Sequence, residues 1–214
     1  MDIKNFSVSH GDAVIYSNFS VSFADGTVTA ILGPSGCGKT TLLNHIASGA
    51  IGARVSYIFQ EPRLIPWRTL EKNIMLSLGQ PSAENRERTR EYLRRVGLEK
   101  RAGEYPDRLS GGERQRASIA RAFANPAPVL LMDEPFQSQD PGQKKALIEL
   151  VRSLQINEPR TIIFVSHDVA DAVAMAERAI IINGRPVSVV LDARIDDGSE
   201  RMLSEVLSCQ RAEW

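Results

Sequence analysis

The stretch VTAILGPSGCGKTTLLNHIAS, Val28–Ser48, decides the fold of this 214-residue chain. Its apolar start predicts a buried strand and its end predicts a helix, with the loop GPSGCGKT (Gly33–Thr40) between them. The loop fits the phosphate-binding motif G-x-x-x-x-G-K-S/T in the strand–loop–helix context that this motif requires. Its glycines let backbone N–H groups surround phosphate oxygens, Lys39 adds a positive charge, and the Thr40 hydroxyl can ligate Mg²⁺. The stretch therefore predicts a site for β- and γ-phosphates with Mg²⁺.

Two further apolar runs have the length of strands, namely VLLM (Val129–Met132) and TIIFVS (Thr161–Ser166). Unbroken apolar runs of this length are typical of strands that are buried on both faces of a parallel sheet. The helical pattern KKALIELVRSLQ precedes the second run, and the helical pattern DVADAVAMAERA follows it. Strands that alternate with helices predict an α/β fold with a mostly parallel sheet.

The two ends of the chain and its middle follow other patterns. Residues 3–23 alternate and carry aromatic side chains, which predicts antiparallel strands. Between residues 61 and 108 the strand-like runs stop, and a charged helix places Tyr92, Leu93 and Val96 on one face. We expect a small helical subdomain here, inserted between strands of the core. The segments PVSVVL and SERMLSEVLSC predict a last strand and a terminal helix.

Two acidic residues and a histidine follow predicted strands. VLLMDEP ends a strand in Asp133, which suits Mg²⁺ beside a phosphate loop, directly or through water. Glu134 points differently along the chain and can orient an attacking water, although two acids at a strand end could instead form a solvated turn. FVSHD places His167 at a third strand end, the edge at which open parallel sheets bind ligands. An imidazole there could be structural, or it could contact a γ-phosphate and Glu134.

A second glycine-containing motif is LSGGERQR, Leu109–Arg116. Ser110 and Glu113 have the spacing of a capping box that starts a helix. Gly111 and Gly112 lie in the first turn, where each glycine costs about 1 kcal/mol relative to alanine. Because bare glycines leave backbone N–H groups open to an anion, the motif indicates a second phosphate contact.

Composition excludes several classes of protein. Lys plus Arg and Asp plus Glu both number 26, so no basic field recruits nucleic acid. Cys37 and Cys209 give no disulfide framework and fit a reducing compartment. The sequence shows no signal peptide and no apolar run near the ~18 residues of a membrane span. We therefore expect a cytosolic protein.

Taken together, the motifs resemble those of the nucleotide-binding subunits of ABC transporters. GPSGCGKTT corresponds to the Walker A loop, Gln60 in YIFQEP to the Q-loop, LSGGERQR to the family signature and VLLMDEP to Walker B. Asp140 corresponds to the D-loop aspartate and His167 to the switch histidine. The motifs stand in the family's order, cover nearly the whole chain and include the highly specific signature.

The resemblance implies a single ABC ATPase domain over residues 1–214. A P-loop NTPase core with an N-terminal antiparallel β-subdomain would occupy residues 1–60 and 110–214, and the helical subdomain residues 61–109. It also implies ATP and Mg²⁺ as cofactors and a nucleotide site that includes the whole Walker A loop: Gly33, Pro34, Ser35, Gly36, Cys37, Gly38, Lys39, Thr40 and Thr41.

Roles for the other site residues also follow from the resemblance. Thr40 and Gln60 would ligate Mg²⁺, with Asp133 acting through water. Glu134 would polarise the attacking water, while His167 would sense the γ-phosphate and Lys39 would hold the phosphates.

The family's subunits pair head to tail and bind two ATP molecules between them. Ser110, Gly111 and Gly112 would therefore hold the γ-phosphate of the ATP bound to the partner copy, and Asp140 would lie at the contact between the copies. Each site would be incomplete in a monomer, so that closure depends on the γ-phosphate and hydrolysis favours opening.

The chain departs from the family's pattern at two places. The family commonly stacks an aromatic residue on adenine just before a glycine near the N-terminus, and here His10 occupies that place. We expect His10 or Tyr16 to stack on the base. The D-loop usually reads Ser-Ala-Leu-Asp and here reads QSQD, residues 137–140. Because only the aspartate is kept, we expect the contacts across the dimer to differ.

The segment EPRLIPWRT, residues 61–69, resembles the corresponding segment in importers of the nitrate, sulfonate, taurine and thiamine group. In the family this region borders the groove that receives a helix of the membrane subunit, and Leu64, Ile65 and Trp67 could grip it. We expect a peripheral subunit on the cytoplasmic face of the cell membrane, with separate permease subunits and an external solute-binding protein. The alternatives are an ABC-type ATPase of DNA maintenance and a weakly catalytic ATP-binding scaffold.

Overall fold

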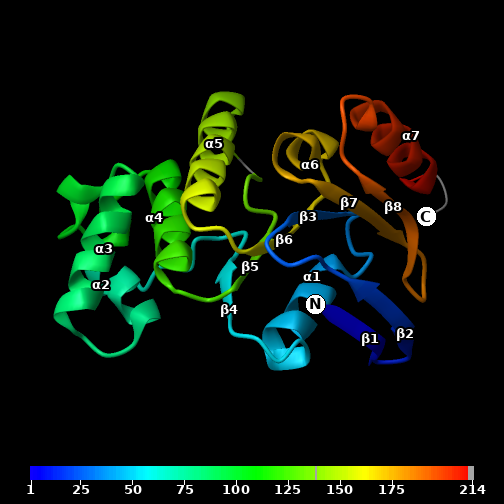
Figure 1. Cartoon of the computed structure of the whole chain (residues 1–214), viewed down its shortest axis with the longest axis horizontal. Coiled ribbons are helices and arrows are strands. Elements are labelled where there is room, and N and C mark those ends of the chain that lie inside the picture. Colours follow the sequence, from blue (N-terminus) through cyan, green and yellow to red (C-terminus); the bar gives the residue numbers. More distant parts are fainter. Residues whose placement is uncertain (138, 212–214) are drawn as a thin grey trace.

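The computed structural model describes residues 1–137 and 139–211, and a six-stranded sheet forms its centre (Figure 1). The strand order is β4-β5-β6-β3-β7-β8; the first five strands are parallel and β8 is antiparallel to β7. The three strands that the apolar runs predict are β3, β5 and β6, which lie side by side. The strands are β3 (Val28–Leu32), β4 (Val55–Ile58), β5 (Val129–Asp133), β6 (Thr161–Ser166), β7 (Arg178–Asn183) and β8 (Ser188–Arg194).

The central strands are buried on both faces, and alternate residues enter two different cores. In β3, Ala30 and Leu32 belong to one core, whereas Ile31 belongs to the other. This alternation follows from the two-residue period of a strand and explains why the runs are continuously apolar. The α/β fold with a mostly parallel sheet is therefore confirmed.

An antiparallel hairpin covers one face of the sheet, as the alternating N-terminal sequence predicts. Strands β1 (Asp2–His10) and β2 (Ala13–Ser22) pair with each other and form a separate two-stranded sheet. Their buried aromatic rings, including Phe6 and Phe19, share a core with helix α1 (Lys39–His45) and the π-helical turn Ile46–Ala50 that continues it. The hairpin thereby supports the phosphate loop from below.

A group of helices forms the opposite end of the molecule from the hairpin (Figure 1). Helix α4 packs against both α2 and α3, and it also contacts β4 and α5. The apolar face of α3 is buried as predicted, through Tyr92, Leu93 and Val96. The elements are α2 (Leu70–Met75), α3 (Ala83–Arg95), α4 (Gly111–Ala124) and the 3₁₀ turns Leu76–Leu78, Glu99–Arg101 and Pro106–Arg108.

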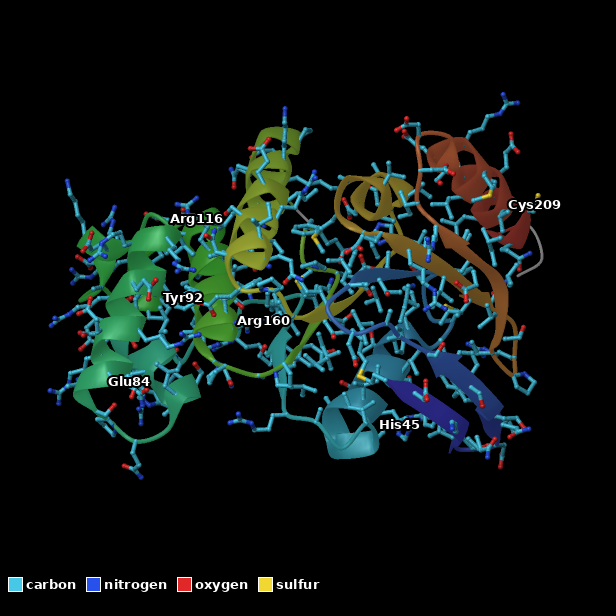
Figure 2. The ribbon with its side chains drawn as sticks, viewed as in Figure 1. His45, Glu84, Tyr92, Arg116, Arg160 and Cys209 are labelled. Carbon is cyan, nitrogen blue, oxygen red and sulfur yellow. The ribbon has the colours of Figure 1, made fainter. Side chains whose placement is uncertain are left out.

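An ion-pair cluster connects this helical end with the sheet. Glu158, just after α5 (Pro141–Asn157), accepts hydrogen bonds from Arg88 of α3 at 2.9 Å and from Arg160 at 3.2 Å. Figure 2 places Tyr92 and Arg160 on the two sides of this boundary. Because Arg160 is buried, its guanidinium depends on these partners and on the carbonyls of Phe123 and Asn125.

The C-terminal part differs from the prediction by one additional strand, β7. The helical pattern DVADAVAMAERA predicts a helix to Ala179, but α6 (Val169–Met175) ends earlier and Arg178 and Ala179 belong to β7. Ala179 pairs with Ala30 in the middle of the sheet, and this burial outweighs the local helical preference. Helix α7 (Ser199–Arg211) follows β8, as predicted. In the described part of the chain, every helix is too short or too polar to cross a lipid bilayer.

Candidate nucleotide-binding site

The site lies at the carboxyl edge of the sheet, where four strands end beside one another. In register, Leu32 pairs with Ser166, and Asp133 pairs with Val165. The phosphate loop, the acidic pair and His167 therefore follow from adjacent strands, and Gln60 follows from β4 next to β5. The loops enclose a cleft of about 340 Å³, lined by Ile15, Ser35, Gly36, Gly38, Lys39, Thr40, Thr41, Gln60, Asp133, Glu134, Gln137 and His167.

The phosphate loop is shaped by close packing below it. A Cβ atom on Gly33 would lie 2.5 Å from the carbonyl oxygen of Ile182, so this position has no room for a side chain. Gly38 has a φ of +105°, in the region that favours glycine. The Lys39 ammonium group donates hydrogen bonds to the carbonyls of Gly33 and Pro34, each at 2.8 Å, so its charge lies within the loop.

Three residues of the Walker A motif do not line the cleft. Gly33, Pro34 and Cys37 are buried beneath the loop that they shape. Burial raises the pKa of the Cys37 thiol, which keeps it protonated and weakly reactive. The second cysteine, Cys209, is exposed on α7 (Figure 2), and both cysteines are free.

The two acidic residues differ in backbone conformation, as separate roles in metal binding and in orienting water require. Asp133 ends β5, and its Oδ1 accepts a hydrogen bond from the Thr40 hydroxyl at 3.1 Å. Glu134 has a φ of +44°, a strained left-handed conformation for a residue with a side chain. Its N–H still bonds the carbonyl of Val165 at 3.1 Å, so the chain turns immediately after the sheet and both carboxylates line the same cleft.

His167 contacts the second of these carboxylates. Its Nδ1 lies 3.0 Å from each Glu134 carboxylate oxygen. The Glu134 side chain is 15% exposed and that of His167 is 40% exposed. The pair therefore joins a shielded carboxylate to an imidazole that reaches the cleft, which is the geometry expected if His167 orients Glu134.

The donor set at Thr40 and Asp133 fits Mg²⁺. Burial raises the pKa of the Asp133 carboxyl, while the Thr40 hydrogen bond and the Lys39 charge oppose this effect. Mg²⁺ prefers oxygen ligands and is usually held by one or two carboxylates together with substrate phosphates. No group of three His, Cys, Asp or Glu side chains in the described residues could hold a metal by itself. Thr40, Asp133 and the Gln60 amide oxygen would therefore hold Mg²⁺ jointly with the phosphates, and the metal would neutralise charge that develops on them.

The expectation that Tyr16 stacks on adenine is wrong. Its ring is fully buried and packs against Phe6 and Phe19, with ring centroids 4.8 and 4.9 Å apart. Its hydroxyl donates a hydrogen bond to the Gly38 carbonyl at 3.0 Å, so Tyr16 supports the phosphate loop from inside. His10 is exposed at the end of β1 but does not line the cleft, and Ile15 is the residue of the hairpin that does.

The signature residues also lie outside the cleft of their own chain. Ser110 is the N-cap of α4, and its hydroxyl accepts from the Glu113 N–H at 3.2 Å while Glu113 accepts from the Ser110 N–H at 2.9 Å. The capping box is therefore confirmed, and these hydrogen bonds lower the pKa of Glu113. Gly112 packs against Gln143 near the start of α5, where Asp140 is the N-cap. Among the described residues, the lining of the cleft does not include Ser110, Gly111, Gly112 or Asp140.

Two residues of the signature helix contact segments of the site, and no sequence pattern indicated either contact. The amide of Gln115 donates to the carbonyl of Pro135 at 2.8 Å, directly after Glu134. The guanidinium of Arg121 donates to the carbonyls of Pro62 and Arg63, shortly after Gln60. Gln137 lines the cleft and accepts a hydrogen bond from Gln60. Gln115 lies within the quoted motif LSGGERQR, which was the only signal that could have indicated it.

Comparisons with known proteins agree with this geometry. Residues 16–137 match the family model described as "ABC transporter". The chain is 39% identical to an aliphatic sulfonates import ATP-binding protein, SsuB, of Ralstonia nicotianae over 87% of this chain and 70% of the relative. It is 32% identical to SsuB 1 of Rhodococcus jostii over 100% of this chain and 89% of the relative.

A solved structure is similar over nearly its whole length. The dimeric post-hydrolysis structure of the ATP-binding cassette MJ0796 with ADP and Pi is 27% identical and has a TM-score of 0.76. The match covers 92% of this chain and 99% of that chain. With the Walker A, Walker B and signature motifs in place, these similarities show that the chain belongs to the ABC transporter family, as an ATP-binding subunit with ATPase activity.

Proposed function

We propose that two copies of this protein bind two ATP molecules between them, head to tail, and that their closure and opening drive import of a solute. The observation that carries this proposal is the position of the signature turn. Ser110 and Gly111 are exposed at the start of a 14-residue helix and lie outside the cleft of their own chain. A phosphate-binding turn without a phosphate loop beside it needs a second molecule.

The hydrogen bonds of the turn support this use. Ser110 satisfies the N–H of Glu113, whereas the N–H groups of Gly111 and Gly112 have no partner among the described residues. Two open N–H groups at the positive end of a helix favour an anion. In the closed pair they would hold the γ-phosphate of the ATP on the partner copy.

The residues of the cleft that carry the chemistry then have distinct tasks. Lys39 and the backbone of the phosphate loop bind the β- and γ-phosphates. Thr40, Gln60 and Asp133 position the Mg²⁺ that the phosphates share. Glu134 accepts a proton from the attacking water, and His167 holds the Glu134 carboxylate and contacts the γ-phosphate. Because the γ-phosphate joins both copies, its release removes the bridge and favours separation.

The segment after Gln60 supports a contact with a membrane subunit. Trp67 is 77% exposed, which is unusual for the largest apolar side chain. Its loop is nevertheless firmly held, because the buried amide of Asn73 donates to the carbonyls of Ile65, Arg68 and Thr69 at 2.9–3.1 Å. Arg121 holds the preceding residues from the signature helix. A movement of α4 would therefore be transmitted to a rigidly presented Trp67.

The solute belongs to the proposal as well. The relatives named above are aliphatic sulfonates import proteins, and the segment EPRLIPWRT points in the same direction. We propose import of a small solute of the nitrate, sulfonate, taurine or thiamine type, with separate permease subunits and an external solute-binding protein. The protein would then act at the cytoplasmic face of the membrane.

Co-purification with the membrane subunits tests this function. We expect Trp67→Ala to keep the Tm and the ATP affinity of the isolated protein but to weaken co-purification and solute-stimulated ATP hydrolysis at least tenfold. Ile156→Ala is the matched control, because Ile156 is 78% exposed on α5 and lies outside this loop. Equal co-purification of both variants, or transport that persists in the Trp67 variant, would contradict the proposed contact.

A further inference from the structure

The altered D-loop contains a side chain that reaches the metal-binding side of the cleft. Gln137 stands where the family usually has serine, and Ser138, which follows it, lies outside the described residues. The Gln137 Oε1 accepts a hydrogen bond from Nε2 of Gln60, and both side chains line the cleft together with Thr40 and Asp133. A serine side chain is two bonds shorter and could not make this contact from the same backbone position.

The direction of the hydrogen bond decides which end of Gln60 faces the ligand. A carboxamide has one oxygen, which can ligate a cation, and one NH₂ group, which cannot. When the NH₂ group donates to Gln137, the oxygen is the end left for the cleft. If the carboxamide were rotated by half a turn, its NH₂ group would face the metal.

The backbone holds Gln137 in this position. Its N–H donates to the carbonyl of Glu134 at 3.2 Å, which closes the turn that starts at the strained Glu134. The carbonyl of Pro135, inside the same turn, accepts a hydrogen bond from the buried Gln115. Gln137 is therefore fixed by the segment that also carries both acidic residues of the site.

We propose that Gln137 is a positioning residue that orients the Gln60 carboxamide so that its oxygen faces Mg²⁺. The inference rests on the proposed function of the same cleft. It gives the unusual D-loop of this chain a role within one copy, in addition to any contact across the dimer. When a residue that hydrogen-bonds to a metal ligand, but does not touch the metal, is removed, the metal affinity typically falls 10- to 100-fold.

Binding of Mn²⁺ in place of Mg²⁺ provides a readout that is independent of hydrolysis. With a non-hydrolysable ATP analogue present, electron paramagnetic resonance measures the Mn²⁺ affinity of the wild-type protein and of Gln137→Met, which lacks the acceptor oxygen. We expect the Met variant to bind Mn²⁺ at least about tenfold more weakly. Its affinity for the analogue in EDTA should stay within about twofold of wild type.

Two further variants make the test specific. Gln137→Glu keeps the acceptor oxygen and should show no loss of Mn²⁺ affinity, while Gln139→Met makes the same chemical change two residues away and should match wild type. The inference is overturned if Gln137→Met binds Mn²⁺ like wild type, or if it loses analogue affinity equally with and without metal. Failure of the wild-type protein to bind Mn²⁺ with the analogue would instead contradict the proposed function.

Discussion

We expect Ser110 to combine a role in folding with a role in ATP binding, and three substitutions separate the two roles. In the fold, its hydroxyl is both acceptor and donor in the capping box with Glu113. In the proposed dimer, the same turn meets the γ-phosphate of the partner's ATP. Ser110→Ala removes the cap, Ser110→Asn keeps an acceptor and a donor without charge, and Ser110→Asp keeps the acceptor but adds a negative charge.

The expected magnitudes differ between the two roles. Loss of an N-cap costs about 1 kcal/mol, which lowers the Tm of a protein of this size by about 2–4 °C. Ser110→Asn should keep the wild-type Tm, and Ser110→Asp should lie between Asn and Ala because Glu113 repels it. A carboxylate about 4 Å from a phosphate oxygen costs about 4 kcal/mol at an effective dielectric constant of 20. This repulsion predicts a loss of about 1,000-fold in ATP turnover for the Asp variant.

Differential scanning fluorimetry, steady-state phosphate release and nucleotide binding to the isolated subunit measure these effects together. The charge variant should bind ATP as a monomer with wild-type affinity, because its own cleft is untouched. Ser110→Arg should likewise lose hydrolysis and keep monomer binding. If Ser110→Asp hydrolyses ATP as fast as Ser110→Asn, the signature turn does not meet a phosphate and the reasoning fails.

Three other changes test separate parts of the structure. Gly33→Ala should cost about 1–3 kcal/mol and abolish nucleotide binding, because its Cβ would lie 2.5 Å from a β7 carbonyl; a wild-type Tm would contradict this packing. Lys144→Gln should cost about 1–2 kcal/mol, because it leaves Asp171 (6% exposed) without its ion pair, whereas Lys145→Gln should cost less than about 0.5 kcal/mol; equal Tm values would refute the difference. Asp133→Asn should raise the Tm while ending hydrolysis. Burial raises the pKa of the wild-type Asp133 carboxyl in the folded state. Ionisation of this carboxyl therefore destabilises the wild-type fold as the pH rises through that pKa. When the Tm is measured over a series of pH values, the increase of the variant over the wild type should therefore be small near pH 4 and largest at neutral pH. An increase in Tm that does not depend on pH would contradict this explanation.

Much of the fold and the site could be predicted from short motifs because each motif fixes a local geometry. An apolar run followed by a phosphate loop determines a strand, a turn and a helix, and DEP and SHD mark the ends of neighbouring strands. Parallel strands then bring these ends to the same edge, so Lys39, Asp133, Glu134 and His167 could be placed together before any coordinates were known. The capping box at Ser110 was equally local.

What the sequence did not reveal depends on packing between distant segments. Tyr16 carries an aromatic ring in a plausible place, but only the fold shows that it lies on the inward face of β2. The contacts of Gln115 with Pro135 and of Arg121 with Pro62 join residues 20 and 59 positions apart, and no local pattern records them. The start of strand β7 could not be predicted, because the residues AERA continue the helical pattern of the preceding segment. Only the pairing with β3 makes Arg178 and Ala179 part of a strand.

The central claim is that ATP is held between two copies, and sedimentation equilibrium of Glu134→Gln tests it most directly. Without the general base, the variant should bind ATP without cleaving it, and the mass should double from the 23.6 kDa of one chain. We expect this doubling with Mg²⁺ and ATP, a monomer with ADP, and a monomer in all conditions when Ser110→Asp is added. A monomer with ATP at high protein concentration, or a dimer that persists in the double variant, would contradict the account.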